Sequence, residues 1–186
     1  MKAIMRIRIC AFAVVFLSIL AAAQERRTAP LVPADMLDGQ RLVDRVSGIS
    51  VLAPDNWVWV WLQRDEDGYR NFSASNPTGG LGFAVNVSRA DLDWTRKNAE
   101  DVQIGMAKKL MASGFKVDPR IFETSAVPIS NSYRFVWAIV LPNGERRFRF
   151  GYVAHGINHI VSFTCIAVGE QEPEEFTRFV RSAKLF

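Results

Sequence analysis

The sequence predicts an α+β domain: an antiparallel β-sheet with two main helices packed on it. Three observations lead to this prediction. Short apolar runs are separated by reversal signals such as Pro54-Asp55-Asn56, Asp67-Gly68 and Asn143-Gly144, which is typical of strands joined by tight turns. One central segment and one C-terminal segment instead repeat apolar residues every three or four positions, as amphipathic helices do. No internal repeat interrupts this pattern.

The amino-terminal segment has the three parts of a secretory signal. Lys2, Arg6 and Arg8 form a basic start, residues 9–20 are nearly all apolar, and Ala21-Ala22-Ala23 supplies small residues for cleavage. The apolar run is shorter than the roughly 20 residues that a membrane-spanning helix needs. We therefore expect residues 1–23 to be a cleaved signal peptide. The mature protein would be periplasmic or extracellular, without stable membrane insertion.

Charge and cysteine content narrow the class of protein further. The chain has 23 Lys and Arg against 19 Asp and Glu, and three of the cations lie in the expected signal peptide. The mature chain would then be close to neutral, which argues against a nucleic-acid partner. Of the two cysteines only Cys165 would remain, so no intramolecular disulfide is expected.

After the signal, the chain divides into a short leader and one domain. Residues 24–46 contain Pro30 and Pro33 without sustained periodicity, so they are predicted to form a flexible leader. Residues 47–186 are predicted to form the α+β domain. Its first five expected strands cover residues 49–52, 57–62, 69–75, 81–88 and 116–129.

Two segments have the pattern of helices. The first ends near Gly114, a typical C-terminal stop, and the second runs from Pro173 to Ser182, with the proline at its first turn. Each has one apolar face. The face of the first helix consists of Ala99, Val102, Met106 and Leu110, and that of the second of Phe176, Phe179 and Val180.

Turn chemistry predicts how the last three strands pair. A two-residue type I′ turn at Asn143-Gly144 would place Trp137 opposite Phe150. A type II′ turn at Gly156-Ile157 would then place Phe150 opposite Phe163. Both turns predict one buried aromatic layer across three strands. This layer would contain Trp137, Phe148, Phe150 and Phe163, with Cys165 beside them.

Three stretches together resemble the PsbP-like fold. They are Gly48-Ile49-Ser50-Val51, then Pro54-Asp55-Asn56-Trp57, and the closing Phe179-Val180-Arg181-Ser182-Ala183-Lys184-Leu185-Phe186. The resemblance covers residues 47–186. Proteins with this fold include an extrinsic photosystem subunit, a nuclear-import regulator that binds a small GTPase, and many exported bacterial proteins. It implies a protein that binds or assembles with others and performs no chemistry of its own, and it transfers no functional residue to this chain.

Residues able to perform chemistry do not form a recognisable site. His159 and Cys165 are six residues apart, about 20 Å along a regular strand, which is too far for a nucleophile and its base. His155 and His159 are not expected to face each other, and no third metal ligand is suggested. The glycine-rich residues 79–82 lead into a strand and not into a helix, so they do not form a phosphate-binding turn. We expect no catalytic residue, no metal and no cofactor.

Candidate contact residues come from one strand and one hairpin. Trp57, Trp59 and Trp61 alternate with apolar residues, which predicts a strand covered on both faces, with Trp57 beside the turn nearest to the surface. A solvent-facing tryptophan ladder for a sugar or a protein is the alternative.

Three arginines form the second candidate contact. Arg147 and Arg149, with Arg134 on the neighbouring strand, could form a basic patch for an anionic ligand, or simply a solvated face. The sequence thus favours a non-enzymatic module that binds an unknown protein or small ligand. The alternative is an enzyme whose site is assembled from scattered carboxylates or histidine.

Overall fold

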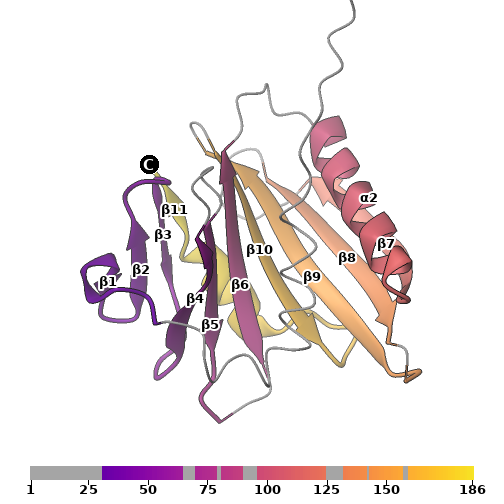
Figure 1. The fold of residues 1–186 in the computed structure, drawn as a ribbon, viewed down its shortest axis with the longest axis horizontal. Helices are drawn as coiled ribbons and strands as arrows, with labels where there is room; N and C mark the ends of the chain where they lie inside the picture. Colours follow the sequence, from indigo (N-terminus) through magenta and orange to yellow (C-terminus); the bar gives the residue numbers. More distant parts are fainter. Residues whose placement is uncertain are drawn as a thin grey trace, which may run out of the picture.

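The computed structural model describes residues 31–64, 70–78, 81–89, 96–124, 132–141, 143–156 and 159–186. Within these ranges the chain forms a seven-stranded and a four-stranded β-sheet (Figure 1), and every strand pairing is antiparallel. The seven-stranded sheet has the order β4-β5-β6-β10-β9-β8-β7, and the four-stranded sheet has the order β1-β2-β3-β11. Their strands are β1 (Leu37–Asp38), β2 (Arg41–Asp44), β3 (Ile49–Leu52), β4 (Val58–Arg64), β5 (Arg70–Ser75), β6 (Gly82–Arg89), β7 (Lys116–Thr124), β8 (Tyr133–Val140), β9 (Arg146–His155), β10 (His159–Ala167) and β11 (Lys184–Leu185).

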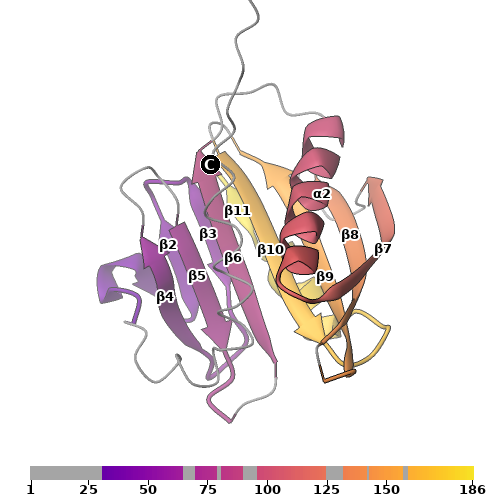
Figure 2. The same ribbon diagram turned by 45° about the vertical axis from the view of Figure 1, so that its right-hand side comes forward.

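The two faces of the seven-stranded sheet are covered by different elements (Figure 2). Helix α2 (Arg96–Ala112) lies on one face, where Leu110 packs in a cluster with Phe135 and Trp137. Helix α3 (Glu174–Arg181) and the four-stranded sheet cover the other face. Strand therefore dominates the described residues. The antiparallel sheet of the prediction is confirmed, whereas the expectation of two main helices holds only loosely, because α3 has just 8 residues.

Helix α3 forms where its sequence pattern predicts it. Pro173 occupies the N-cap position with φ −59°, and Glu174 and Glu175 lie in the first turn, where they face the positive end of the helix dipole. Phe176 and Phe179 are fully buried, and their rings lie 5.2 Å and 5.0 Å from the ring of Phe83. The amphipathic face of this short helix therefore forms the centre of the larger core.

Helix α2 buries Ala99 and Leu110, as the spacing predicts. The side chains of Val102 and Met106 lie outside the described residues. The helix ends at Ala112, and Gly114 just beyond it has φ +88°, which allows Phe115 N to donate to Leu110 O at 3.1 Å. The same buried side of α2 also carries a polar residue, Gln103.

The predicted boundary at residue 47 is wrong, because part of the expected leader belongs to the domain. Strand β2 pairs with β3, Leu42 is fully buried, and the buried carboxylate of Asp44 forms an ion pair of 2.6 Å with Arg70. β1 and β2 have two and four residues, too few for a visible periodicity. Strand β3 pairs with β2 and with β11 from the far end of the chain.

The β8–β9 hairpin has a different turn from the one predicted. Leu141 N donates to Glu145 O at 2.9 Å, and Gly144 has φ +85°. The loop therefore contains three residues and ends in a left-handed glycine, a common alternative to the two-residue turn. As a result Trp137 is paired with Arg149, and Phe150 is paired with Val136.

This shift of one residue moves Trp137 to the other side of the sheet. Trp137 lies in the cluster beneath α2, whereas Phe148, Phe150 and Phe163 lie in the core that contains α3. The predicted single aromatic layer is therefore correct for the three phenylalanines and wrong for Trp137.

The β9–β10 hairpin also differs from the prediction, but without changing faces. Phe163 is paired with Tyr152, and Cys165 is paired with Phe150, two positions away from the predicted register. Gly156 N donates to His159 O at 2.8 Å, so the hydrogen bond that closes the hairpin joins residues 156 and 159, one position further along the chain than in the predicted type II′ turn. A shift of two residues leaves each side chain on its original face, so Cys165 still lies in the predicted layer.

Candidate functional site

The turn between β3 and β4 has a fixed backbone geometry. Trp57 N donates to Pro54 O at 3.2 Å, and Asn56 has φ +64°. This conformation suits asparagine at the third position of a type II turn. The β3 end is also held, because Leu52 N donates to Ser182 Oγ at 2.8 Å.

The tryptophans of β4 are largely covered, as expected. Trp59 and Trp61 are buried. Trp57 is half-buried, with its ring 4.7 Å from that of Phe83. On either side of the turn, however, Leu52 is 42% exposed and Val58 is 40% exposed. We call Leu52, Asp55, Asn56, Trp57 and Val58 the β3–β4 corner: an exposed turn whose flanking aliphatic side chains meet water.

The three candidate arginines do not form one basic patch. Arg134 is paired with Tyr152 on the face covered by α3, whereas Arg147 and Arg149 lie on the opposite face. Arg147 forms an ion pair with Glu145 at the hairpin end. The geometry therefore separates the positive charges that the sequence suggested could act together.

Arg149 is a buried cation, with only 2% of its surface exposed. Its guanidinium lies 4.7 Å from the ring centre of Phe135 and 4.9 Å from that of Trp137, and Nη1 donates to Gln103 Oε1 at 3.4 Å. Burial lowers its pKa to about 9, so the side chain remains charged at neutral pH. Two aromatic faces and an amide thus partly replace the water that the cation has lost.

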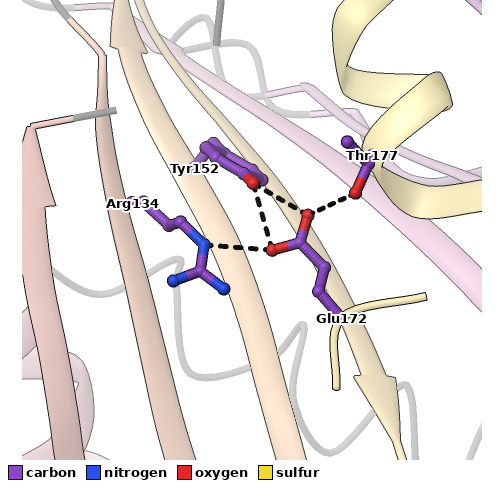
Figure 3. A network of polar contacts seen from close by, with 4 residues as sticks. All are labelled: Arg134, Tyr152, Glu172 and Thr177. Carbon is purple, nitrogen blue, oxygen red and sulfur yellow. Dashed lines mark hydrogen bonds and ion pairs between the residues drawn. The ribbon is translucent and has the colours of Figure 1, made fainter. Parts of the chain in front are cut away.

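The most connected polar group among the described residues is the carboxylate of Glu172, between β10 and α3 (Figure 3). It accepts hydrogen bonds from Tyr152 Oη at 2.8 and 3.0 Å, from Thr177 Oγ1 at 2.8 Å and from Arg134 Nε at 3.1 Å. These contacts join β8, β9 and α3. The sequence did not point to Glu172, because it lies in a loop, where no periodicity marks a functional side chain.

The surroundings of this carboxylate shift the pKa of its partners. Burial and the hydrogen bond to Glu172 raise the pKa of Tyr152 well above its ordinary value. Burial alone would lower the pKa of Arg134, but the hydrogen bond and charge of Glu172 raise it overall. Both carboxylate oxygens of Glu172 accept hydrogen bonds from internal donors. The network of Arg134, Tyr152, Glu172 and Thr177 therefore holds α3 to strands β8 and β9.

Cys165 lies in the core, where it is fully buried beside Phe150 and Phe83. Burial raises the pKa of its thiol, which disfavours the reactive thiolate. His155 is paired with Ile160 and not with His159. In the described part of the chain, no three His, Cys, Asp or Glu side chains gather closely enough to hold a metal ion.

Across the described ranges, no helix combines the length and apolar character needed to cross a membrane. No protein-family model matches the sequence, and neither does any curated protein.

Solved structures do share the fold. The solution structure of cyanobacterial PsbP (CyanoP) from Synechocystis sp. PCC 6803 aligns with a TM-score of 0.63 at 16% identity, over 83% of this chain and 98% of that one. A crystal structure from Bacteroides thetaiotaomicron VPI-5482 aligns with a TM-score of 0.50 at 8% identity, over 81% of this chain but only 49% of that one. The likeness to CyanoP over nearly its whole length agrees with the sequence motifs, and the chain therefore has a PsbP-like fold.

Proposed function

We propose that this chain is an exported, non-enzymatic binding or assembly module that contacts a protein partner through the β3–β4 corner. The observation that carries the proposal is the pair of exposed aliphatic side chains, Leu52 and Val58, on either side of a fixed turn. Apolar side chains that remain exposed beside an aromatic residue are a common feature of protein interfaces.

The corner is held firmly enough to bind without a large loss of flexibility. Ser182 accepts a hydrogen bond from Leu52 N, and Trp59 Nε1 donates to Gln40 O at 2.9 Å. Trp57 is packed on Phe83. Because these contacts already order the backbone, binding costs less conformational entropy than it would in a free loop.

The hydrogen bonding of Glu172 and the burial of Cys165 support a binding function over catalysis. Both carboxylate oxygens of Glu172 accept hydrogen bonds from internal donors, and Cys165 is buried in the core, where the pKa of its thiol is raised. The PsbP-like fold gives further support by analogy, and the basic, apolar and small-residue parts of residues 1–23 support export.

Site-specific photo-crosslinking in intact cells tests this proposal. A photoreactive residue is placed at Leu52 or at Val58, and the matched control is placed at Ile104, an aliphatic residue of α2 that is 51% exposed and lies outside the corner. We expect a discrete protein adduct from both corner positions and none from the control. Equal adducts from all three positions, or none from the corner, would reject the corner as the contact surface.

A further inference from the structure

One half of the seven-stranded sheet carries a polar surface that is nevertheless buried. On β5, β6 and β10, most side chains on the α2 side of the sheet are short and polar, and each of these polar side chains is less than 9% exposed. The same face also carries Ala84, Ile160 and Ile166. We call the group of polar side chains the polar floor. It consists of Asn71, Ser73 and Ser75 of β5, Asn86 and Ser88 of β6, and Ser162 and Thr164 of β10.

Strand register places these residues side by side. Asn86 is paired with Asn71 on one side and with Ser162 on the other, so the three form a row across the sheet. The alternating residues of the same strands, including Val85 and Phe163, point into the core that contains α3. The polar floor therefore lies on the face of the seven-stranded sheet that faces away from α3. Helix α2 lies on this same face, next to the polar floor.

Two neighbouring atoms of the polar floor lack a hydrogen-bond partner. Asn86 Oδ1 and Ser162 Oγ are both buried and unsatisfied, although the two residues are direct cross-strand partners. Buried polar groups are rarely left unpaired because each costs free energy, so this arrangement suits a further molecule that supplies the missing partners.

We propose that the polar floor binds a small, neutral, hydroxyl-rich ligand of the sugar or polyol class. A single ligand hydroxyl can donate to Asn86 Oδ1 and at the same time accept from the Ser162 hydroxyl. The floor consists of Asn, Ser and Thr, without an ionisable side chain, so it recognises by hydrogen bonding and not by charge. This inference rests on the proposed function only in that the chain is a binding module.

Thermal unfolding of the full chain with a panel of neutral mono- and disaccharides and polyols tests the inference. We expect at least one member at millimolar concentration to raise Tm by roughly 2–4 °C or more, because a ligand that binds only the folded state stabilises it. Ser162→Ala should keep the ligand-free Tm, since its hydroxyl has no partner, but lose the ligand-induced shift. The matched control is Ser132→Ala, which removes another buried hydroxyl without a partner outside the floor and should keep the shift.

Three results would overturn the inference. The first is that no panel member raises Tm or gives heat on titration, and the second is that Ser162→Ala keeps the full shift. The third is a crystal structure, grown with saturating sugar, in which only water bridges Asn86 and Ser162. Crosslinking at Val58 without any sugar binding would reject this inference and leave the proposed function intact, whereas the reverse result would reject only the protein contact.

Discussion

Gly151 of β9 lies directly beneath the aromatic ring of Phe135, its cross-strand partner on β8. A β-carbon at position 151 would overlap this ring, standing 2.6 Å from its Cε1 atom. Glycine is needed here for space, because any side chain would displace the ring that lies under the Arg149 guanidinium. The contact thus links the packing beneath α2 to the burial of Arg149.

We therefore expect Gly151→Ala to lower the free energy of unfolding by about 1–3 kcal/mol, as overpacking of a core does. Gly156→Ala is the matched control, because a β-carbon there would meet its nearest neighbour, His159 O, at an ordinary 3.6 Å. Urea denaturation of both variants measures the difference. Equal stability of the two variants would show that Phe135 does not occupy the space above Gly151.

A double-mutant cycle tests the register of β8 and β9. Phe150→Ala and Trp137→Ala should each cost about 3–5 kcal/mol, as large core truncations do. Because the two side chains lie on opposite faces of the sheet, their effects should add within about 0.5 kcal/mol. A coupling above about 1 kcal/mol would instead favour the two-residue turn, in which the two rings are direct partners.

Cys165 should behave as a core residue and not as a reactive thiol. Its burial and raised pKa leave little thiolate in the folded protein near neutral pH. A thiol reagent should therefore label folded protein far more slowly than protein in denaturant. Labelling at the unfolded rate would contradict this placement and reopen a redox role.

The ion pair between Asp44 and Arg70 should be essential to the joining of the two sheets. Asp44→Ala removes the buried carboxylate and leaves the partly buried guanidinium of Arg70 without its partner, which should cost about 3 kcal/mol. Asp38→Ala in β1, where the carboxylate is exposed, is the control and should change stability by less than about 0.5 kcal/mol. Similar small effects of both substitutions would indicate that β2 contributes little to the domain.

Tyr152 should make stability depend on pH in the alkaline range. The unfolded tyrosine ionises near pH 10, whereas burial and Glu172 keep the folded one protonated to higher pH. Its contribution is fully present below about pH 10 and is lost as pH rises above that value. Tyr152→Phe should therefore show a weaker decline in stability above pH 10 than the wild type, and parallel declines would argue against the shift.

Local patterns were enough to predict most elements and both α-helices of the described chain. The apolar face of α3 and the turn at Pro54 follow from spacing and from backbone preferences that act over a few residues. The β8–β9 register could not be predicted in this way, because a loop that contains Asn143-Gly144 closes with either two or three residues. Because the loop has three residues, Trp137 lies on the other face of the sheet from the predicted one, and its cross-strand partner is Arg149.

Long-range partners account for the rest of the difference. β2 is paired with β3, which in turn pairs with β11 from the far end of the chain. Glu172 is bound by Tyr152 and Arg134 on distant strands. The polar floor combines three strands whose alternating pattern, read singly, is typical of a solvent-exposed face. No local signal in the sequence identifies such groupings, because each depends on strand order.

Under the proposed function, the protein acts by binding a partner at the β3–β4 corner and not by turnover. The most direct measurement compares two variants in a strain that lacks the gene, after thermal unfolding has confirmed that both are folded. Leu52→Asp/Val58→Asp should fail to restore the wild-type phenotype, because the charges disrupt the aliphatic contact. His155→Ala/His159→Ala/Cys165→Ser should restore it. Restoration by the corner variant together with failure of the other would contradict the claim.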